Sequence, residues 1–162
     1  MSYGKQEIYD LLDEKGIRYT AVEHAPVYTM EDLHALNLPE EGNIAKNLFL
    51  RSGNKKNFYL IVAASETRIN LKELGLKIGA KGLSFAPEHC LEEILGLYSG
   101  AVTPLGVLND RECRVKVYLD RKFRRKTLAI HPNDNAASIW LSCDDLEDLI
   151  REHGNEVEYI SL

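Results

Sequence analysis

The chain has few cysteines and no long hydrophobic run, and both shortages limit the classes of protein to which it can belong. Its three cysteines, Cys90, Cys113 and Cys143, are odd in number and in no paired spacing, so they predict neither a disulfide framework nor a zinc site. No stretch approaches the roughly 18 apolar residues of a membrane helix, and the first residues lack the pattern of a secretion signal. We therefore expect a soluble protein of the reducing cytoplasm, without a membrane partner.

The sequence is also poor in positive charge and in the short motifs of common enzymes. Its net charge of −5 argues against a protein that coats nucleic acids, and we expect no DNA partner, but the charge leaves room for a local basic patch. The chain contains no G-x-S-x-G or H-E-x-x-H motif, no Gly-rich phosphate loop and no histidine pair with the spacing of metal ligands. We expect neither a metal nor a cofactor.

Helical and strand patterns follow one another without the regular rhythm of βαβ units. The 162 residues, 44% of them hydrophobic, suffice for one domain, which we place at residues 1–162. Apolar spacing and capping residues predict helices around 8–15, 29–36, 70–78, 86–95 and 144–152, with Pro39 and Gly42 ending the second. Runs rich in β-branched and aromatic residues predict strands at 18–23, 44–50, 58–64, 115–119, 127–130, 137–141 and 157–160. The sequence therefore predicts an α+β domain with a mixed, largely antiparallel sheet flanked by helices.

The stretch from Thr127 to Leu141 places two apolar runs around a polar centre that begins with His131 and Pro132. The centre is rich in Asn and Asp, which favour turns, so the pattern predicts a hairpin with the imidazole of His131 at a strand end. Loops on rigid strands often carry sites, which makes His131 a candidate binding residue. The alternative, of equal weight, is that His131 only hydrogen-bonds the turn.

Lys46 stands inside an otherwise apolar strand pattern, between Ala45 and Asn47. Such a lysine either extends to a strand edge, where it discourages aggregation, or points into a polar cavity that receives an anionic group. The glycine-containing loop from Gly100 to Gly106 either lets its backbone approach a small ligand or is an ordinary turn. The residues alone leave both alternatives open.

The segment Arg121–Lys126 is the strongest charge feature of this acidic chain. It contains five cations around Phe123, namely Arg121, Lys122, Arg124, Arg125 and Lys126. Such a run is usually a solvated turn between strands. Because this one leads into His131, we expect a basic loop with an aromatic ring that overhangs the site and holds a phosphate backbone.

Four motifs together resemble a known family. They are EHAPVYT (23–29), AKNLFL (45–50), SGAVTPLG (99–106) and IHPNDNAAS (130–138), and in this order and spacing they resemble the YbaK/ProX family of freestanding aminoacyl-tRNA editing domains. The forms GAVTP and KNLFL look closest to the ProXp-ala (PrdX-like) branch. The resemblance covers nearly the whole chain and implies a partly barrel-like α+β fold, that of the YbaK/ProRS-associated editing domains. It also implies metal-independent hydrolysis, in trans, of alanine wrongly attached to proline tRNA.

The resemblance assigns roles by position. Lys46 matches the lysine required for deacylation, with Asn47 beside it, and His131 matches the pocket histidine. The loop that contacts the aminoacyl group through its backbone corresponds to Gly100, Ala101, Val102, Thr103 and Pro104. Met30 and Leu33 lie on the helix whose apolar residues set the size of the pocket. The family commonly carries threonines after the His-Pro pair, where this chain has Ala136, Ala137 and Ser138.

The expected chemistry is simple, because an aminoacyl ester is already activated. Its hydrolysis needs an oriented water or ribose hydroxyl and a place for developing negative charge, for which a cation and backbone amides suffice. The expected partner is mischarged tRNA(Pro), with prolyl-tRNA synthetase as an optional second one. Two alternatives stay open: a deacylase of the YbaK type for Cys-tRNA(Pro), and a non-catalytic tRNA-binding or synthetase-associated module.

Overall fold

The computed structural model describes residues 2–36 and 43–162, in which helices and strands alternate irregularly. The helices are α1 (Lys5–Glu14), α2 (Met30–His34), α3 (Leu71–Ile78), α4 (Glu88–Cys90) and α5 (Cys143–His153), with a π-helical turn η2 (Leu91–Leu95) and two 3-10 helices, η3 (Pro104–Asn109) and η4 (Arg121–Phe123). The strands are β1 (Tyr19–Glu23), β2 (Ala45–Arg51), β3 (Phe58–Ala64), β4 (Ser84–Phe85), β5 (Val115–Asp120), β6 (Thr127–Ile130), β7 (Ala137–Ser142) and β8 (Val157–Ile160).

These strands form two sheets. The larger has the order β4-β2-β3-β5-β8, in which β2 is antiparallel to β3 and β4 while β3, β5 and β8 are mutually parallel. The smaller, β1-β7-β6, is antiparallel throughout. A parallel bridge between Ile44 and Ala129 joins the two sheets beside the start of β2. The predicted mixed, largely antiparallel arrangement is confirmed.

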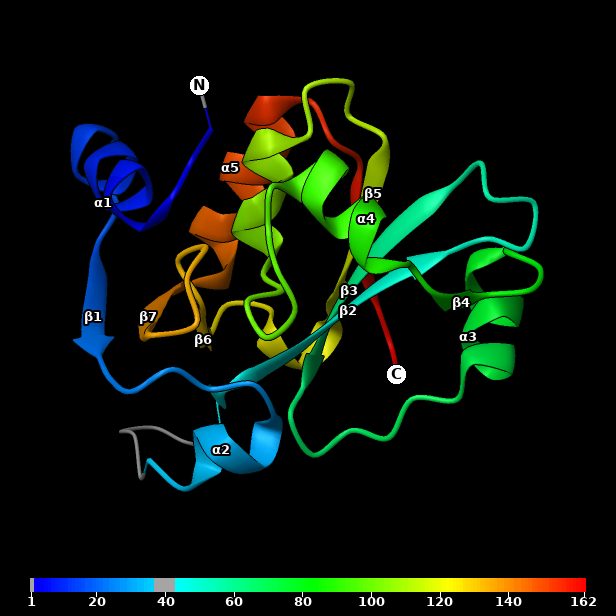
Figure 1. Ribbon diagram of the computed structural model, residues 1–162, viewed down its shortest axis with the longest axis horizontal. Helices are drawn as coiled ribbons and strands as arrows, with labels where there is room; N and C mark the ends of the chain where they lie inside the picture. Colours follow the sequence, from blue (N-terminus) through cyan, green and yellow to red (C-terminus); the bar gives the residue numbers. More distant parts are fainter. Residues whose placement is uncertain (1, 37–42) are drawn as a thin grey trace.

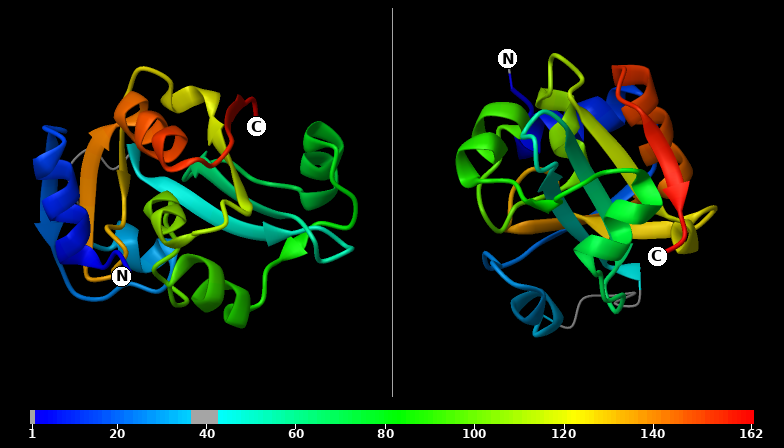
Figure 2. Two further views of the ribbon diagram at one scale, coloured as in Figure 1. Left: turned by 90° about the horizontal axis from the view of Figure 1, so that it is seen from above. Right: turned by 90° about the vertical axis from the view of Figure 1, so that its right-hand side faces the viewer.

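The helices cover both faces of the larger sheet. On one face, α5, η2 and η3 share the main core with α1 and the smaller sheet, and on the other face α3 packs on Leu50, Ile61 and Tyr118. Figure 1 shows α1 and β1 at one end of the molecule and α3 and β4 at the other, and Figure 2 gives the same arrangement from two further sides. The helix α2 covers a small separate cluster that includes Ile44 and Trp140.

Local chemistry explains where the helices begin and end. Asn70 caps α3 by accepting hydrogen bonds from the N–H groups of Lys72 and Glu73, and Gly79 ends the helix in the left-handed region at φ +72°. Thr29 caps α2 by accepting from Asp32 N at 3.0 Å, as the capping-box pattern predicts. These helix ends are therefore set by the sequence nearby.

Three expectations need correction or lie outside the description. The helix expected around 86–95 begins only at Glu88, after Pro87, and then widens into the π-helical turn η2 before Gly96. The segment expected as a loop contains η3, because Thr103 accepts a hydrogen bond from Leu105 N and Pro104 suits a first helical position. Pro39 and Gly42 lie outside the described residues.

Candidate active site

A cavity of about 270 Å³ opens beside the first half of β2. Seven residues assigned to the site from the sequence line it: Met30, Leu33, Lys46, Asn47, Gly100, Val102 and His131. The other lining residues, Val27, Tyr28, Thr29, Ala45 and Leu48, come from β2 and the segment before α2. The structure thus brings four separate parts of the chain together around one hollow.

The cavity exists because the edge of β2 is open at this point. The short strand β4 pairs only with Leu50 and Arg51, so within the described residues the stretch from Ala45 to Leu48 pairs along one side alone, with β3. Successive side chains of a strand point to opposite faces, so Lys46 and Asn47 leave β2 in opposite directions. Both can line the same cavity only because no neighbouring strand separates them.

Each of these two side chains is held by a backbone carbonyl. Lys46 Nζ donates to Thr67 O, in the segment between β3 and α3, and Asn47 Nδ2 donates to Val102 O at 3.2 Å. No carboxylate pairs with Lys46 among the described residues, so its positive charge is available to a ligand. Asn47 Oδ1 is buried and has no hydrogen-bond donor among the described residues, which is an uncommon state for a buried carbonyl oxygen.

His131 is fixed at both ends. Its backbone oxygen accepts from Thr103 Oγ1 at 2.6 Å, and its ring Nδ1 lies 2.9 Å from Ala137 O. A carbonyl oxygen can only accept, so Nδ1 carries a proton and Nε2 of the neutral ring is left as an acceptor. Burial lowers the pKa of His131, opposed by the bond to Ala137 O, and neighbouring His24 lowers it further. The imidazole is therefore neutral at physiological pH.

The residues that replace the expected threonines serve the scaffold. Ala137 supplies the carbonyl that orients His131, and Ala136 O accepts from His24 N at 2.9 Å. Ser138 Oγ lies 2.9 Å from Nε2 of His24, whose ring centroid is 6.4 Å from that of His131. Ala137 thus orients His131, while Ala136 and Ser138 hold the neighbouring His24. None of the three lines the cavity.

Some residues of the glycine loop line the cavity, and the others are buried behind them. Gly100 has φ +95°, and a Cβ there would lie 3.0 Å from the Tyr28 ring and 3.2 Å from Val27 O, so only glycine lets these segments pack together. No hydrogen bond among the described residues uses the N–H of Gly100 or of Val102. Ala101, Thr103 and Pro104 are buried behind the wall, outside the cavity lining.

Asn135 connects the segment before α2 to the glycine loop. Its side chain donates to Val27 O at 2.8 Å and accepts from Tyr98 Oη at 2.9 Å, and its backbone N–H donates to that same phenol oxygen. Its backbone oxygen accepts from Val27 N at 3.0 Å. A single buried amide therefore sets the distance between the segment before α2 and the glycine loop.

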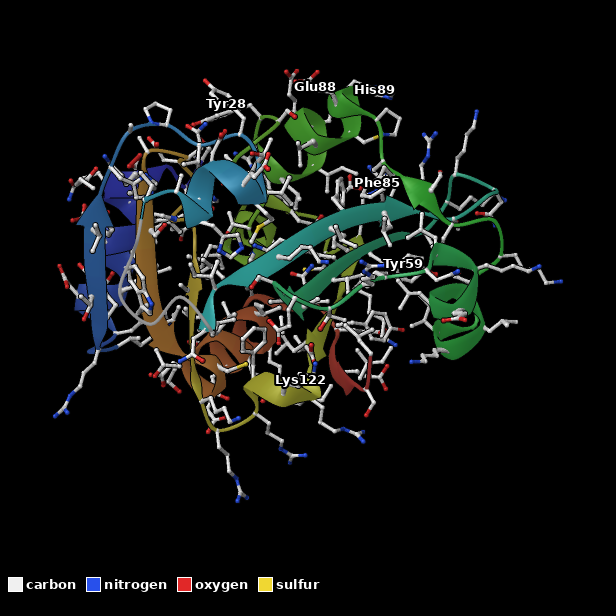
Figure 3. The ribbon with its side chains drawn as sticks, turned by 90° about the horizontal axis from the view of Figure 1, so that it is seen from below. Tyr28, Tyr59, Phe85, Glu88, His89 and Lys122 are labelled. Carbon is white, nitrogen blue, oxygen red and sulfur yellow. The ribbon has the colours of Figure 1, made fainter. Side chains whose placement is uncertain are left out.

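The basic loop approaches the site from the other face of the sheet. All five cations of Arg121–Lys126 are exposed, whereas Phe123 is buried, so the expectation of an aromatic ring that overhangs the site is wrong. Lys122 Nζ lies 3.4 Å from the hydroxyl of Thr67, whose carbonyl holds Lys46. Figure 3 shows Tyr28 and Phe85 on one side of β2 and Lys122 on the other.

Residues that the sequence did not single out complete the site. Thr67 and Asn135 act through contacts with residues 21 and 108 positions away in the chain, and no local pattern marks such contacts. Tyr28 belongs to the EHAPVYT motif, which was the available signal for its position. The described residues contain no group of three or more His, Cys, Asp or Glu side chains arranged to hold a metal ion. Nor does the described part contain a helix long and apolar enough to cross a membrane.

The fold and the cavity define an α+β domain with a small cavity lined by a lysine and by the glycine loop. Comparison of the sequence with protein families identifies the class: the chain belongs to the family of aminoacyl-tRNA editing domains, which matches residues 24–149. The resemblance inferred from the four motifs is thereby confirmed. Membership makes the protein an editing enzyme of the aminoacyl-tRNA hydrolase type.

Individual relatives cover nearly the whole chain. The prolyl-tRNA editing protein ProX of Acetoanaerobium sticklandii is 44% identical over 159 residues, 98% of this chain and 97% of its own length. The prolyl-tRNA synthetase associated domain-containing protein 1 of Mus musculus is 34% identical, over 94% of this chain and 92% of its own length. A crystal structure of a candidate trans-editing enzyme for prolyl tRNA synthetase superposes with a TM-score of 0.73 at 20% identity, covering 100% of this chain and 99% of that one. This likeness supports the fold.

Proposed function

We propose that the protein hydrolyses mischarged Ala-tRNA(Pro) in trans, with residues 1–162 acting as one editing domain in the cytoplasm, where tRNA is charged. The observation that carries the proposal is the cavity beside β2. Among the described residues, an ammonium without a carboxylate partner, an amide oxygen without a donor and a neutral imidazole surround its small apolar space. A relative named as a prolyl-tRNA editing protein supports the choice of tRNA.

The proposed chemistry assigns a role to each group. The ammonium of Lys46 stabilises the negative charge that develops on the ester carbonyl, helped by the free N–H groups of Gly100 and Val102. The α-ammonium of the aminoacyl group supplies the donor that Asn47 Oδ1 lacks. Nε2 of His131 accepts a hydrogen bond from the attacking water or from the ribose hydroxyl.

The size of the cavity supports alanine as the amino acid removed. Met30 and Leu33 form its apolar side, and Leu33 is almost fully buried, so a larger side chain meets a wall that cannot recede. A steric wall rejects a larger substrate more strongly than an open pocket rejects a smaller one. Removal of cysteine from the same tRNA is the second candidate, since its thiol adds little volume. Prolyl-tRNA synthetase is proposed as a partner that delivers the tRNA.

The test is deacylation of a panel of charged tRNAs by the wild type and by Lys46→Ala. We expect Ala-tRNA(Pro) to be hydrolysed faster than Cys-tRNA(Pro), and Pro-tRNA(Pro) to survive. Lys46→Ala should fold normally and lose at least about 100-fold in kcat/KM, the cost typical of removing one group that stabilises a developing oxyanion. His131→Ala should lose less.

Two controls accompany the panel. Prolonged chelation should leave the rate unchanged once the tRNA is folded, because no metal takes part in the proposed chemistry. Lys15→Ala, an exposed lysine at the end of α1, is the matched control for loss of a lysine. Near wild-type turnover by Lys46→Ala would refute the assignment of the catalytic lysine, and preference for Cys-tRNA(Pro) would replace alanine with the second candidate.

A further inference from the structure

Charge is distributed unevenly between the two ends of the molecule. Residues 43–87 contain eight Lys or Arg and two Glu, a net of +6, whereas the whole chain carries −5, so the remaining residues carry −11. These residues include β2, β3, α3 and β4, which reach the end of the molecule opposite α1 and β1 (Figure 1). An acidic protein with one positive end attracts a polyanion to that end and repels it from the other.

The cations of residues 43–87 form no ion pair with a carboxylate among the described residues. The ion pairs among the described residues employ Lys5, Lys15, Lys116 and Arg151, all outside residues 43–87. Three exposed lysines, Lys55, Lys56 and Lys81, form no side-chain hydrogen bond or ion pair within the described part of the chain. We call these three residues the lysine tip.

The lysine tip is held together by the backbone. Lys55 and Lys56 lie on the turn between β2 and β3, and Lys81 lies on the turn between α3 and β4. Gly53 N donates to Lys81 O at 2.8 Å, and a Cβ on Gly82 would lie only 3.0 Å from Gly53 Cα. The two turns are therefore packed directly against each other, so the three lysines are carried by one continuous backbone surface.

The strand β2 connects the cavity to the lysine tip. Lys46 lies near one end of the strand and Arg51 at the other, a distance of about 17 Å at roughly 3.3 Å per residue. Between them Phe85 of β4 pairs with Leu50 and is 61% exposed, on the same side of β2 as Tyr28 (Figure 3). Exposed aromatic rings provide stacking platforms for unpaired bases.

We propose that the acceptor arm of the tRNA lies on the lysine tip while its unpaired 3′ end runs along β2, past Phe85, into the cavity. This proposal rests on the proposed function for the identity of the RNA. It adds a second phosphate-binding surface to the basic loop Arg121–Lys126, because it places the duplex at the α3 and β4 end of the molecule.

The experiment compares two variants with the same change in charge. The tip variant is Lys55→Gln/Lys56→Gln/Lys81→Gln, and the control variant is Lys5→Gln/Lys15→Gln/Arg18→Gln at the acidic end, where the exposed ion pairs contribute little to stability. The dissociation constant of uncharged tRNA(Pro) is measured over a salt series. The tip variant should raise it on the order of ten-fold near 0.1 M salt and reduce the slope of log affinity against log salt by about 2 to 3. The control variant should leave the slope unchanged.

A second substrate separates this proposal from the proposed function. A short alanylated oligonucleotide reaches the cavity but not the lysine tip, so the tip variant should hydrolyse it at the wild-type kcat/KM. Equal salt slopes for the wild type and the tip variant, or equal losses of affinity in the tip and control variants, would overturn the proposed surface. If the wild type binds tRNA through the tip but hydrolyses neither substrate, the surface stands and the proposed function fails.

Discussion

His131 combines a fixed tautomer with a burial that opposes its protonation. Burial lowers its pKa from the ordinary value of 6.5, with a smaller contribution in the same direction from His24, while Ala137 O and Asp134 act against the shift. The unfolded chain therefore binds a proton near pH 6.5, but the folded protein binds it only at a lower pH. The unfolded state then holds more protons in this window, so the free energy of unfolding falls as the pH drops through 6.5.

This linkage predicts a measurable difference between the wild type and His131→Asn. Above pH 7 the imidazole is neutral in both states, so acidification there should leave its contribution unchanged. Between pH 6.5 and the lower folded pKa, the wild type should lose up to about 1.4 kcal/mol per pH unit more than the variant. Urea unfolding at a series of pH values measures this difference, with the exposed His89→Asn as the matched control. Parallel pH profiles for the wild type and His131→Asn would contradict the buried, neutral histidine.

At the scale of elements, α2 is a single short helix that forms the apolar side of the cavity. Met30 is half-buried and Leu33 is buried, both on the side that lines the cavity, while Glu31 is exposed. Met30→Ala should enlarge the cavity at a smaller stability cost than Leu33→Ala, because truncating a fully buried leucine costs about 2 to 5 kcal/mol. We therefore expect amino-acid selection to depend on this helix.

Met30→Ala should therefore relax selection against larger amino acids. We expect the ratio of kcat/KM for Pro-tRNA(Pro) to that for Ala-tRNA(Pro) to rise about 10-fold or more, the usual value of a methylene or two in an apolar pocket. Glu31→Ala, a truncation on the exposed side of the same helix, should leave the ratio unchanged. An unchanged ratio in Met30→Ala would show that selection by size lies elsewhere.

The basic loop between β5 and β6 gives a prediction that distinguishes binding from chemistry. Arg124→Gln/Arg125→Gln should raise KM for charged tRNA and leave kcat unchanged, because phosphate contacts position the substrate without touching the ester. For each phosphate that the variant no longer neutralises, the plot of log affinity against log salt should become flatter by about 0.7 to 0.9.

A matched pair exists for this experiment on the turn before β5. Arg124 lies over the Tyr159 ring at 5.3 Å, and Arg114 lies over the Phe58 ring at 4.9 Å, so Arg111→Gln/Arg114→Gln removes the same charges and a similar ring contact. Only the loop variant should change KM and the salt slope. A solvated loop with no role in binding predicts identical behaviour of the two variants.

At the scale of the whole molecule, the sequence predicted the features whose causes are local. The segment Phe58–Ala64 is a continuous apolar run, which predicts a strand buried on both faces. The structure has a strand with the same bounds, and both of its faces are covered. The end of α3 at Gly79 follows from a glycine that adopts the left-handed conformation. The cavity residues on β2, α2 and the hairpin were singled out by the resemblance of their motifs to a known family, because the residues alone left the roles of Lys46 and His131 open.

Features with distant causes could not be read from the sequence. Phe123 looked like an exposed ring among five cations, but the main core reaches it across the sheet and buries it. Thr67 became part of the site because Lys46 of β2 and Lys122 of the basic loop both contact it. The helix η3 arose inside a stretch rich in Gly and Pro, where the cap from Thr103 outweighed the composition. For Phe123 and Thr67 the determining partners lie far away in the chain, whereas the cap of η3 is local but was hidden by the surrounding composition.

The pairing of β1 with β7 also constrains the order in which the chain can fold. Tyr19 pairs with Leu141, so 122 residues separate the two partners. At a synthesis rate of about 5 to 20 residues per second, β1 leaves the ribosome roughly 6 to 24 seconds before its partner exists. An unpaired strand can pair with other chains during this interval. Because β1 is short and ends in Glu23, it is a poor template for such pairing. Closure of the smaller sheet, and with it the position of His131, is therefore among the last events of biosynthesis.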